Sequence, residues 1–420
     1  MRILLCTADG GGNVPALASI VGELVRRGHT VRVLAGPYFP GAPRSESLEA
    51  SFSAAGCEVV NREAEAWLEG AGPMPDILAI PDHLQMLRSM AIWMPMSVPW
   101  AVETAREIES FRPAVVLADL ITPGSAIAAE AAGLPYVLPL TTVHVHRLFP
   151  GLGVPGKGAP PGKDEQAEQD EFHRIANEIA MPWLNAARTR LGLRPDTDPW
   201  AWEDRAKRLL ILSSPAFDFR ADAYPSNFVY TGSVRPAEPS GGWDNPWGAA
   251  DQRPLVVVST TTTGLAGLWF AVFQTAAKAL VELGMRGLMT VGPLNPNTLP
   301  QDESLEYRSF VPHSAVLPLA AAMVSQCGHG TAIAALRHGV PLVCVPVFAD
   351  QYDIAARIVH HGAGIGLSTT SSQEEFRAAI EAVVNDKKYR EAARVLAEKL
   401  ASDDGATRAA DEIESAAGRA

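Results

Sequence analysis

The chain has 420 residues, of which 47% are hydrophobic and 20% are charged, and its formal net charge is -12 at pH 7. This length suits two domains of roughly 200 residues each, and the composition is ordinary for a soluble globular protein. The negative charge argues against a protein that binds nucleic acid, because such proteins usually carry a basic field. It does not exclude a nucleotide ligand, which needs only a local group of hydrogen-bond donors.

The first half of the chain alternates short apolar runs with amphipathic segments, the pattern of a doubly wound α/β domain. It opens with a strand at residues 2–7, a helix at residues 15–27 that Gly28 ends, and a strand at residues 30–34. The turn at residues 9–13 lacks the G-x-G-x-x-G spacing, so it predicts no dinucleotide site. Further along this half we expect a strand and a helix within 41–69, strands at 113–119, 135–140, 208–213 and 228–230, a helix at 126–132 and an acidic helix at 164–191.

A segment rich in Met and Trp, residues 84–96, has two interpretations. It could be a helix that packs in the core, or an adaptable wall for a bulky apolar ligand, because Met is flexible and polarisable. The second interpretation makes Met86, Met90 and Trp93 ligand contacts. Residues 151–162 are rich in Gly and Pro and predict a loop that flanks the same ligand.

The second half begins after residues 235–253, which are rich in Pro and Gly and read as a linker. A block in which a helix ends at Gly133 and a strand follows recurs at Gly339, which hints at two similar α/β halves. In this half we expect strands at 254–259 and 287–291, a polar turn at 260–264, and helices at 269–283, 374–400 and 406–417.

The most informative stretch, residues 324–351, reads as a buried strand, a Gly-rich turn, a helix, a second strand and a polar loop. Gly328 and Gly330 would let the backbone approach a ligand closely. A helix that starts at about Thr331 turns its free N–H groups and the positive end of its dipole toward that turn. The stretch therefore predicts a phosphate site.

The four cysteines, Cys6, Cys57, Cys327 and Cys344, are scattered and form no CxxC pair. This favours reduced thiols over a disulfide framework or a zinc site. The apolar run at residues 3–6 is too short for a signal peptide, and no run of ~18 apolar residues predicts a membrane span. We therefore expect a cytoplasmic protein.

Several motifs together resemble glycosyltransferase family 1, above all actinobacterial enzymes that glycosylate natural products. They stand in the family's order along almost the whole chain: residues 13–31, residues 230–234, Val311-Pro312-His313, residues 326–331, Gly339-Val340-Pro341-Leu342 and Ala349-Asp350-Gln351. The resemblance implies an α/β GT-B fold, in which two Rossmann-like domains with parallel sheets face a cleft. It implies an acceptor-binding domain at residues 1–232, a linker at 233–253, a nucleotide-sugar domain at 254–400, and a C-terminal helix at 401–420 that could cross back to the first domain.

The resemblance also implies a reaction. It predicts an inverting, metal-independent transfer of a sugar from a UDP- or dTDP-sugar to a hydrophobic natural product, such as a polyketide or aromatic aglycone. The nucleotide sugar is a co-substrate, and no cofactor or metal is expected. The helix N-terminus would stabilise the charge on the leaving diphosphate. Expected partners are these two small molecules and no nucleic acid, and a homodimer stays open.

At two positions of the expected donor site, this sequence differs from the residues that are usual in the family. The family usually has a histidine at Gln326, and glutamine keeps a donor but carries no charge, so leaving-group stabilisation is either weaker or moved to His329. Ile354 stands where the family often has Asn. The carboxylate of Asp350 and the amide of Gln351 supply acceptors and donors for sugar hydroxyls. The expected donor contacts are Ser259, Thr260, Val311, Gln326, Gly328, His329, Gly330, Thr331, Asp350 and Gln351.

The predicted catalytic pair is Asn13 and Asp119. Asn13 falls where the family places a catalytic histidine, and Asp119 matches the carboxylate that orients it. Asparagine cannot accept a proton at neutral pH. Asn13 could therefore only position an acceptor that is already acidic or nucleophilic, such as a phenol or an electron-rich ring carbon.

Three alternatives stay open. The base could be another group, namely Asp119, Asp9, His144 or His146, and His144 is also an expected acceptor contact. The protein could be a weak or inactive GT-B protein that binds ligands and assists a partner. It could also be a sugar-nucleotide epimerase of the same fold, although the Met/Trp segment and the donor motifs speak against that.

Overall fold

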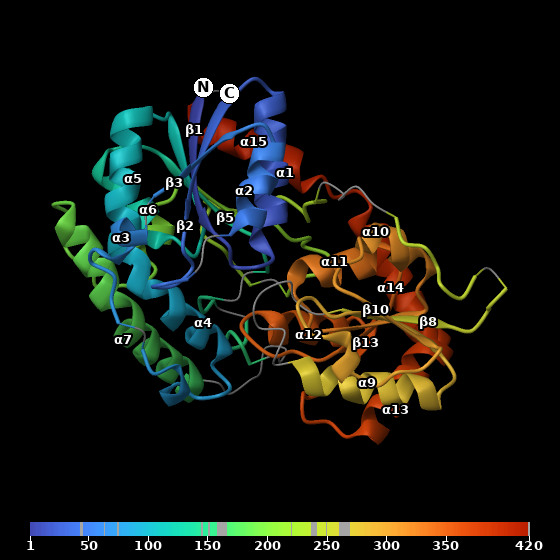
Figure 1. Ribbon diagram of the computed structural model, residues 1–420. Coiled ribbons are helices and arrows are strands. Elements are labelled where there is room, and N and C mark those ends of the chain that lie inside the picture. The colour runs from blue at the N-terminus through green and yellow to red at the C-terminus, as the bar shows by residue number, and fades with distance from the viewer. Residues whose placement is uncertain are drawn as a thin grey trace.

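The computed structural model describes residues 1–42, 45–62, 64–73, 75–143, 146–149, 152–157, 166–219, 221–236, 242–248, 250–259 and 269–418. These residues form two parallel β-sheets, each flanked by helices, in two halves that lie side by side (Figure 1). The predicted α/β class is confirmed.

The N-terminal half contains a parallel sheet with strand order β3-β2-β1-β4-β5-β6-β7 among the described residues. Its central strands are buried on both faces, as expected for a parallel sheet covered by helices. The strands are β1 (Arg2–Ala8), β2 (Thr30–Gly36), β3 (Glu58–Asn61), β4 (Val115–Ala118), β5 (Tyr136–Leu140), β6 (Arg208–Ile211) and β7 (Phe228–Tyr230).

Helices cover both faces of this sheet (Figure 1). In α1 the buried side chains, among them Leu17, Val21 and Leu24, follow the helical repeat and pack on β1 and β2. The helices are α1 (Asn13–Arg26), α2 (Glu46–Ala54), α3 (Ala64–Leu68), α4 (Gln85–Trp93), α5 (Ser97–Phe111), α6 (Pro123–Ala131), α7 (Gln166–Arg190) and α8 (Ala201–Asp204), with short 3-10 turns at Ile77–Ala79 and Met94–Met96.

The C-terminal half repeats the architecture around a parallel sheet with the order β10-β9-β8-β11-β12-β13. Its strands are β8 (Leu255–Ser259), β9 (Arg286–Thr290), β10 (Leu305–Arg308), β11 (Ala322–Ser325), β12 (Leu342–Cys344) and β13 (Gly364–Gly366). Its helices are α9 (Phe270–Glu282), α10 (His313–Val316), α11 (His329–Arg337), α12 (Gln351–His360), α13 (Gln373–Asn385) and α14 (Lys387–Leu400), with 3-10 turns at Pro296–Thr298 and Leu317–Leu319.

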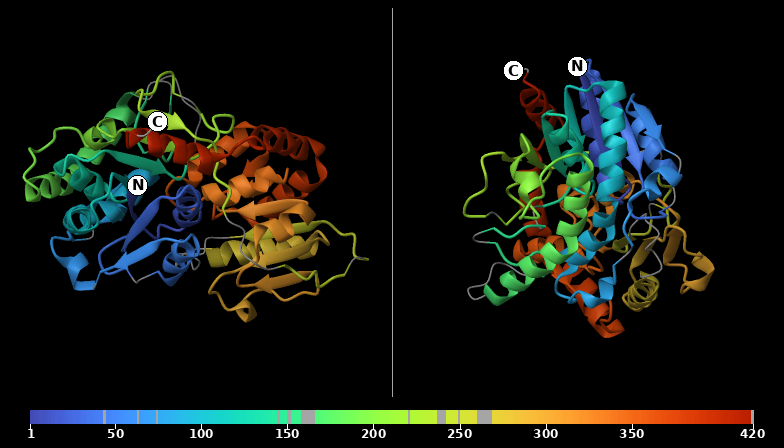
Figure 2. Two further views of the ribbon diagram at one scale, coloured as in Figure 1. Left: turned by 90° about the horizontal axis from the view of Figure 1, so that it is seen from above. Right: turned by 90° about the vertical axis from the view of Figure 1, so that its left-hand side faces the viewer.

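The last helix, α15 (Gly405–Ala416), returns to the N-terminal half and packs beside α1 (Figure 2). Ala409, Ala410 and Ile413 are buried in the same apolar cluster as the α1 side chains. Beside this cluster, Arg27 of the loop after α1 donates hydrogen bonds of 2.7 Å to Asp411 and 2.7 Å to Glu414 of α15. The two halves are therefore held together by the end of the chain as well as by the linker.

Element boundaries differ from the predictions in a few places. Helix α11 begins at His329 and not at about Thr331, so the Gly-rich turn is shorter than expected. Helix α1 begins at Asn13 and not at Pro15, which places Asn13 in the first turn. Residues 41–69 contain two helices and not one. Residues 151 and 158–162 of the predicted loop, and the whole polar turn at 260–264, lie outside the described residues.

Candidate functional site

The carboxyl ends of the two sheets face each other. Thr142, just after β5, donates a hydrogen bond from its hydroxyl to the carboxylate of Asp350, which follows β12. Ser213, just after β6, lies with its Oγ 3.0 Å from Nε2 of His329, which follows β11. Carboxyl ends of parallel strands are the usual ligand-binding edge of such sheets. We therefore place the candidate site where these two edges meet.

On the N-terminal side, Asn13 and Asp119 lie in contact. Asp119 follows β4, and Asn13 stands in the first turn of the helix after β1. The Asn13 amide donates hydrogen bonds of 2.7 Å to Oδ2 of Asp119 and 2.7 Å to the carbonyl oxygen of Ala8. Its own carbonyl oxygen accepts a hydrogen bond of 3.0 Å from the backbone N–H of Gly10. The amide orientation is thereby set, with its oxygen on the side of the Gly10 turn.

Asp119 is a buried carboxyl group, only 2% exposed. Burial raises its pKa to about 6, and hydrogen bonds from Thr7 and Asn13 oppose that rise. Thr7 donates to the same oxygen as Asn13, at 2.6 Å. The Asp119 carboxyl group is therefore ionised at neutral pH, but it binds a proton more readily than an exposed aspartate does. It remains a candidate base.

Two of the three other proposed bases, Asp9 and His146, are engaged elsewhere. Asp9 accepts hydrogen bonds of 3.0 Å from the backbone of Gly11 and 2.5 Å from Ser45, the residue that caps α2. His146 is buried and lies 2.8 Å from the carboxylate of Glu203. Both arrangements give these side chains a structural role. His144 lies outside the described residues.

On the C-terminal side, the turn between β11 and α11 has the features of an anion site. The backbone of Cys327 is left-handed, with a φ of 67°, a conformation that costs free energy for any residue other than glycine. Gly328 caps α11 without a side chain, so the first N–H groups of the helix have no capping acceptor. Gly330 is exposed, and a Cβ atom there would meet nothing within 4 Å. Thr331 is half-buried in the first turn of α11.

Gln326 lies beside this helix N-terminus. Its side chain is only 9% exposed, and within the described residues no group forms a hydrogen bond with its amide. Its Nε2 is 3.6 Å from the position a Cβ atom would take on Gly328. Among the described residues nothing competes for this donor, so it is available to a ligand at the turn.

His329 does not supply the positive charge that Gln326 lacks. Burial and the charge of Arg357 lower the pKa of His329 to about 4, so the imidazole is neutral at pH 7. It contacts Ser213 of the other half through Nε2. In this arrangement His329 offers a hydrogen bond rather than a charge.

The two residues expected to bind the sugar, Asp350 and Gln351, lie at the N-terminus of helix α12. The Gln351 side-chain oxygen accepts hydrogen bonds of 2.9 Å and 3.0 Å from the backbone of Val347 and Phe348. Its NH2 group is therefore the part left to donate to a ligand. Burial raises the pKa of Asp350, whose carboxylate also accepts the hydrogen bond from Thr142. Ile354 is fully buried, so the floor below this pair is apolar.

The remaining donor contacts take different positions. Ser259, at the end of β8, is 4% exposed and lies 3.3 Å from Nε2 of His313. Burial lowers the pKa of His313. Val311 is buried in the apolar core of this half, which leaves its backbone as the group that could meet a ligand. Thr260 lies outside the described residues.

The predicted acceptor contacts of the Met/Trp segment are buried. Met90 and Trp93 belong to the core of the N-terminal half. Met86 packs with Val143 and Phe217 against side chains of the C-terminal half. This geometry favours the packing interpretation, with Met86 in the joint between the halves, and their contact with an acceptor stays a prediction.

Sequence reasoning missed a set of residues that join the halves. Arg357 of α12 donates a hydrogen bond of 2.6 Å to Asp218, and its guanidinium lies 4.5 Å from the ring centre of Phe219. The Asp353 carboxylate accepts a hydrogen bond of 2.7 Å from the backbone of Gly156. No local pattern marks such pairs, because their partners are far apart in the sequence.

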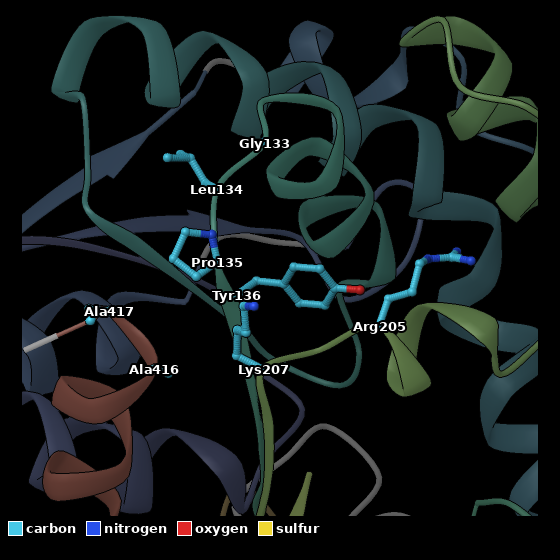
Figure 3. Close-up of a pocket in the computed structure, with 9 residues that line it drawn as sticks. Gly133, Leu134, Pro135, Tyr136, Arg205, Lys207, Ala416 and Ala417 are labelled. Atoms are coloured by element: carbon cyan, nitrogen blue, oxygen red, sulfur yellow. The ribbon is translucent and has the colours of Figure 1, made fainter.

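A cavity of about 300 Å³ lies away from this site. It is lined by Tyr136, Arg205, Lys207 and the end of α15, at the amino ends of β5 and β6 (Figure 3). Over the described ranges, no cluster of three or more His, Cys, Asp or Glu side chains could hold a metal ion. None of the helices described is both long and apolar enough to cross a membrane.

Known proteins are similar to this chain in sequence and in fold. Residues 297–415 match the family described as Erythromycin biosynthesis protein CIII-like, C-terminal domain. The chain is 28% identical over 435 residues to the 4'-demethylrebeccamycin synthase of Lentzea aerocolonigenes, which covers 98% of this chain and 99% of that protein. The glycotransferase of kitacinnamycin has a TM-score of 0.74 and 21% identity and covers 99% of this chain and 98% of its own. The glycosyltransferase VinC in complex with dTDP has a TM-score of 0.70 and 19% identity and covers 100% of both chains.

The fold is therefore GT-B, with two Rossmann-like domains, and the protein is a glycosyltransferase of the natural-product type. The match of residues 297–415 to the EryCIII-like C-terminal domain family agrees with the predicted resemblance to glycosyltransferase family 1.

Proposed function

We propose that this protein transfers a sugar, with inversion and without a metal, from a UDP- or dTDP-sugar to a hydrophobic natural product such as a polyketide or aromatic aglycone. One observation supports the proposal. The Asn13–Asp119 pair lies at the carboxyl edge of one sheet, and the uncapped N-terminus of α11 lies at the carboxyl edge of the other. Contacts between Thr142 and Asp350 and between Ser213 and His329 join these two edges. An acceptor on the first edge would meet a donor on the second. A cytoplasmic location, and either a monomer or a homodimer, are compatible with this function.

The donor would lie along the C-terminal edge. The N–H groups of α11 and the Gln326 amide would hold the diphosphate, and Asp350 with the Gln351 NH2 group would hold sugar hydroxyls. The structural relative VinC is described in complex with dTDP, which supports a nucleotide diphosphate as the leaving group. As the bond between the anomeric carbon of the sugar and the diphosphate breaks, negative charge grows on the phosphate oxygens. Fixed N–H donors stabilise this charge.

The acceptor would meet the N-terminal edge at Asn13. The Asn13 oxygen has a second lone pair beside the one that Gly10 uses, so it can orient an acceptor X–H without removing the proton. The acceptor then needs to be acidic or strongly nucleophilic. A phenol reacts as its anion, and an electron-rich ring carbon loses its proton after the new bond forms. Asp119 is the alternative base, because its pKa lies nearer to neutrality than that of an exposed aspartate.

The test is a release assay for the nucleoside diphosphate. The protein is incubated with a panel of UDP- and dTDP-sugars, with and without phenolic and polyketide aglycones. Diphosphate release that depends on the aglycone, together with a glycosylated product of inverted anomeric configuration, supports the proposal. Release that requires added divalent metal, or a product of retained configuration, contradicts its mechanism.

A second candidate is a catalytically weak GT-B protein that binds nucleotide and assists a partner. The amide at Asn13 and the uncharged pair of Gln326 and His329 favour it, since each lacks the group that the usual reaction uses. Tight nucleotide binding without turnover on any aglycone would select this candidate over the transferase.

A further inference from the structure

Tyr38 lies beside the catalytic pair, in the segment that follows β2. A Cβ atom placed on Gly10 would be 3.6 Å from Cε2 of the Tyr38 ring, 3.3 Å from the Asn13 side-chain oxygen and 3.4 Å from Cδ1 of Ile121. The three side chains therefore surround one glycine at the carboxyl edge of the sheet. The missing Cβ leaves the Asn13 oxygen and the phenol ring facing the same small space.

The Tyr38 hydroxyl is poorly satisfied by the protein. Over the ranges that the structure describes, its one hydrogen-bond partner is Oγ of Ser89 at 3.4 Å, which is long for a bond between hydroxyl groups. Ser89 belongs to α4 and is itself buried. A half-buried phenol with only one long hydrogen bond gains from a better partner.

The Tyr38 hydroxyl also senses the negative charge of carboxylates from both halves. Burial raises the pKa of Tyr38 to about 12, and the charges of Asp350 and Asp119 add to the rise. The phenol therefore stays protonated at neutral pH and remains a donor. One of these carboxylates belongs to the acceptor side and the other to the sugar side, so Tyr38 is close to the place where acceptor and sugar would meet.

We propose that Tyr38 is an acceptor-positioning residue: its ring packs against an aromatic acceptor beside Gly10, and its hydroxyl donates a hydrogen bond to a polar atom of that acceptor. The inference rests on the proposed function, because it uses the same site. It assigns Tyr38 to the acceptor and not to the donor, because the ring contacts the turn of the N-terminal half that holds Asn13. Tyrosine suits this role, since its apolar ring and polar tip match a flat molecule with hydroxyl groups.

The test measures binding of a phenolic probe, 4-methylumbelliferone, by fluorescence titration. The variants are Tyr38→Phe, which keeps the ring and removes the hydroxyl, and Tyr389→Phe, a matched control on α14 whose ring packs against the apolar core of the C-terminal half. We expect Tyr38→Phe to bind the probe about three- to tenfold more weakly, the loss of one hydrogen bond. The Tyr389→Phe control and the affinity of every variant for dTDP should stay unchanged.

Three results overturn the inference: equal probe affinity of Tyr38→Phe and wild type, no binding of the probe by wild type, or loss of dTDP affinity in Tyr38→Phe. A thermal melt of Tyr38→Phe confirms that the variant is folded. Sugar transfer is measured on the same samples. If wild type transfers no sugar but Tyr38→Phe still loses probe affinity, the proposed function fails while the assignment of Tyr38 stands.

Discussion

The amide of Asn13 donates a hydrogen bond of 2.7 Å to the carboxylate of Asp119. In the proposed function this contact stands where a catalytic histidine would meet its orienting carboxylate, and the base itself is missing. In the usual arrangement an imidazole lies between the carboxylate and the acceptor proton. Here an amide fills that place, and its oxygen faces the Gly10 turn. The pair can orient an acceptor, but Asn13 cannot take its proton.

Replacing Asn13 with histidine should add base catalysis. The imidazole would contact Asp119, which would hold one ring nitrogen and leave the other toward the acceptor. We expect kcat/KM to rise up to about 100-fold for an alcohol acceptor, the lower end of what general base catalysis supplies. The gain for an acidic phenol should be smaller, because a phenol ionises without help. The measurement is the pH profile of kcat/KM, which should acquire a new limb near the pKa of histidine.

The control for this change is Asn13→Ala, which removes the side chain and adds no base. It should lower kcat/KM for every acceptor, because the oxygen that orients X–H is lost. If Asn13→Ala is as active as wild type, the positioning role assigned to Asn13 is wrong.

Replacing Gln326 with histidine should strengthen the diphosphate site. The negative charge of a bound diphosphate would favour the protonated form of a histidine at position 326, and neither Gln326 nor the neutral His329 provides such a charge. We expect dTDP to bind roughly tenfold more tightly at pH 6, with a smaller gain at pH 8 where the new imidazole is neutral. Isothermal titration calorimetry at the two pH values measures this difference. Gln301→His, on an exposed loop, is the matched control and should bind dTDP like wild type.

The fold, and the positions of Asn13 and Gln326 at the two sheet edges, could be predicted from the sequence because they depend on local patterns. Buried strands next to Gly-rich turns place Asn13 after β1 and Gln326 after β11, at the edges where parallel strands end. Asn13 and Asp119 meet because β1 and β4 are neighbours in the sheet. Periodicity and turn residues are sufficient to indicate such positions.

The contacts between the halves could not be predicted in this way. The hydrogen bond between Ser213 and His329 joins residues far apart in sequence, and neither lies in a pattern that names its partner. The neutral state of His329 likewise follows from burial and from Arg357, which only the packed structure brings near. The burial of Met90 and Trp93 depends on how α4 packs, which the Met/Trp composition left open.

Removing Asp218 should destabilise the joint between the halves. Its carboxylate forms a buried pair with Arg357, whose side chain is 3% exposed. Asp218→Ala leaves the guanidinium buried without its partner, which typically costs about 3–5 kcal/mol. We expect a lower Tm by differential scanning calorimetry. The double variant Asp218→Leu with Arg357→Met should recover part of the loss, because it removes both charges of this pair. The recovery is incomplete, because Asp353, whose carboxylate lies 3.9 Å from Arg357, loses that counter-charge.

The control for this pair is Glu374→Gln, which removes an exposed partner of Arg377 and should leave the melting curve unchanged. An unchanged Tm in Asp218→Ala would contradict the view that the Asp218–Arg357 pair holds the halves together.

Asp353 should make the stability depend on pH near neutrality. Its carboxyl group accepts a hydrogen bond of 2.7 Å from the backbone of Gly156 in the other half, and burial raises its pKa to about 7 from an ordinary 3.8. The folded protein therefore holds this proton more tightly than the unfolded chain. The stability from this group is fully present below pH 3.8 and is lost as the pH rises through about 7.

Asp353→Asn should remove this dependence, because asparagine keeps an acceptor for Gly156 and does not ionise. Between pH 5 and pH 7, we expect the free energy of unfolding of wild type to fall relative to that of Asp353→Asn, by at most about 1.4 kcal/mol per pH unit. Urea unfolding at a series of pH values measures the two curves. Asp386→Asn is the control, because a hydrogen bond from Lys388 lowers the pKa of that exposed carboxylate, so it does not titrate in this range. Parallel curves for Asp353→Asn and wild type would show that the Asp353 carboxylate is ionised throughout, and that the contact with Gly156 does not depend on a proton.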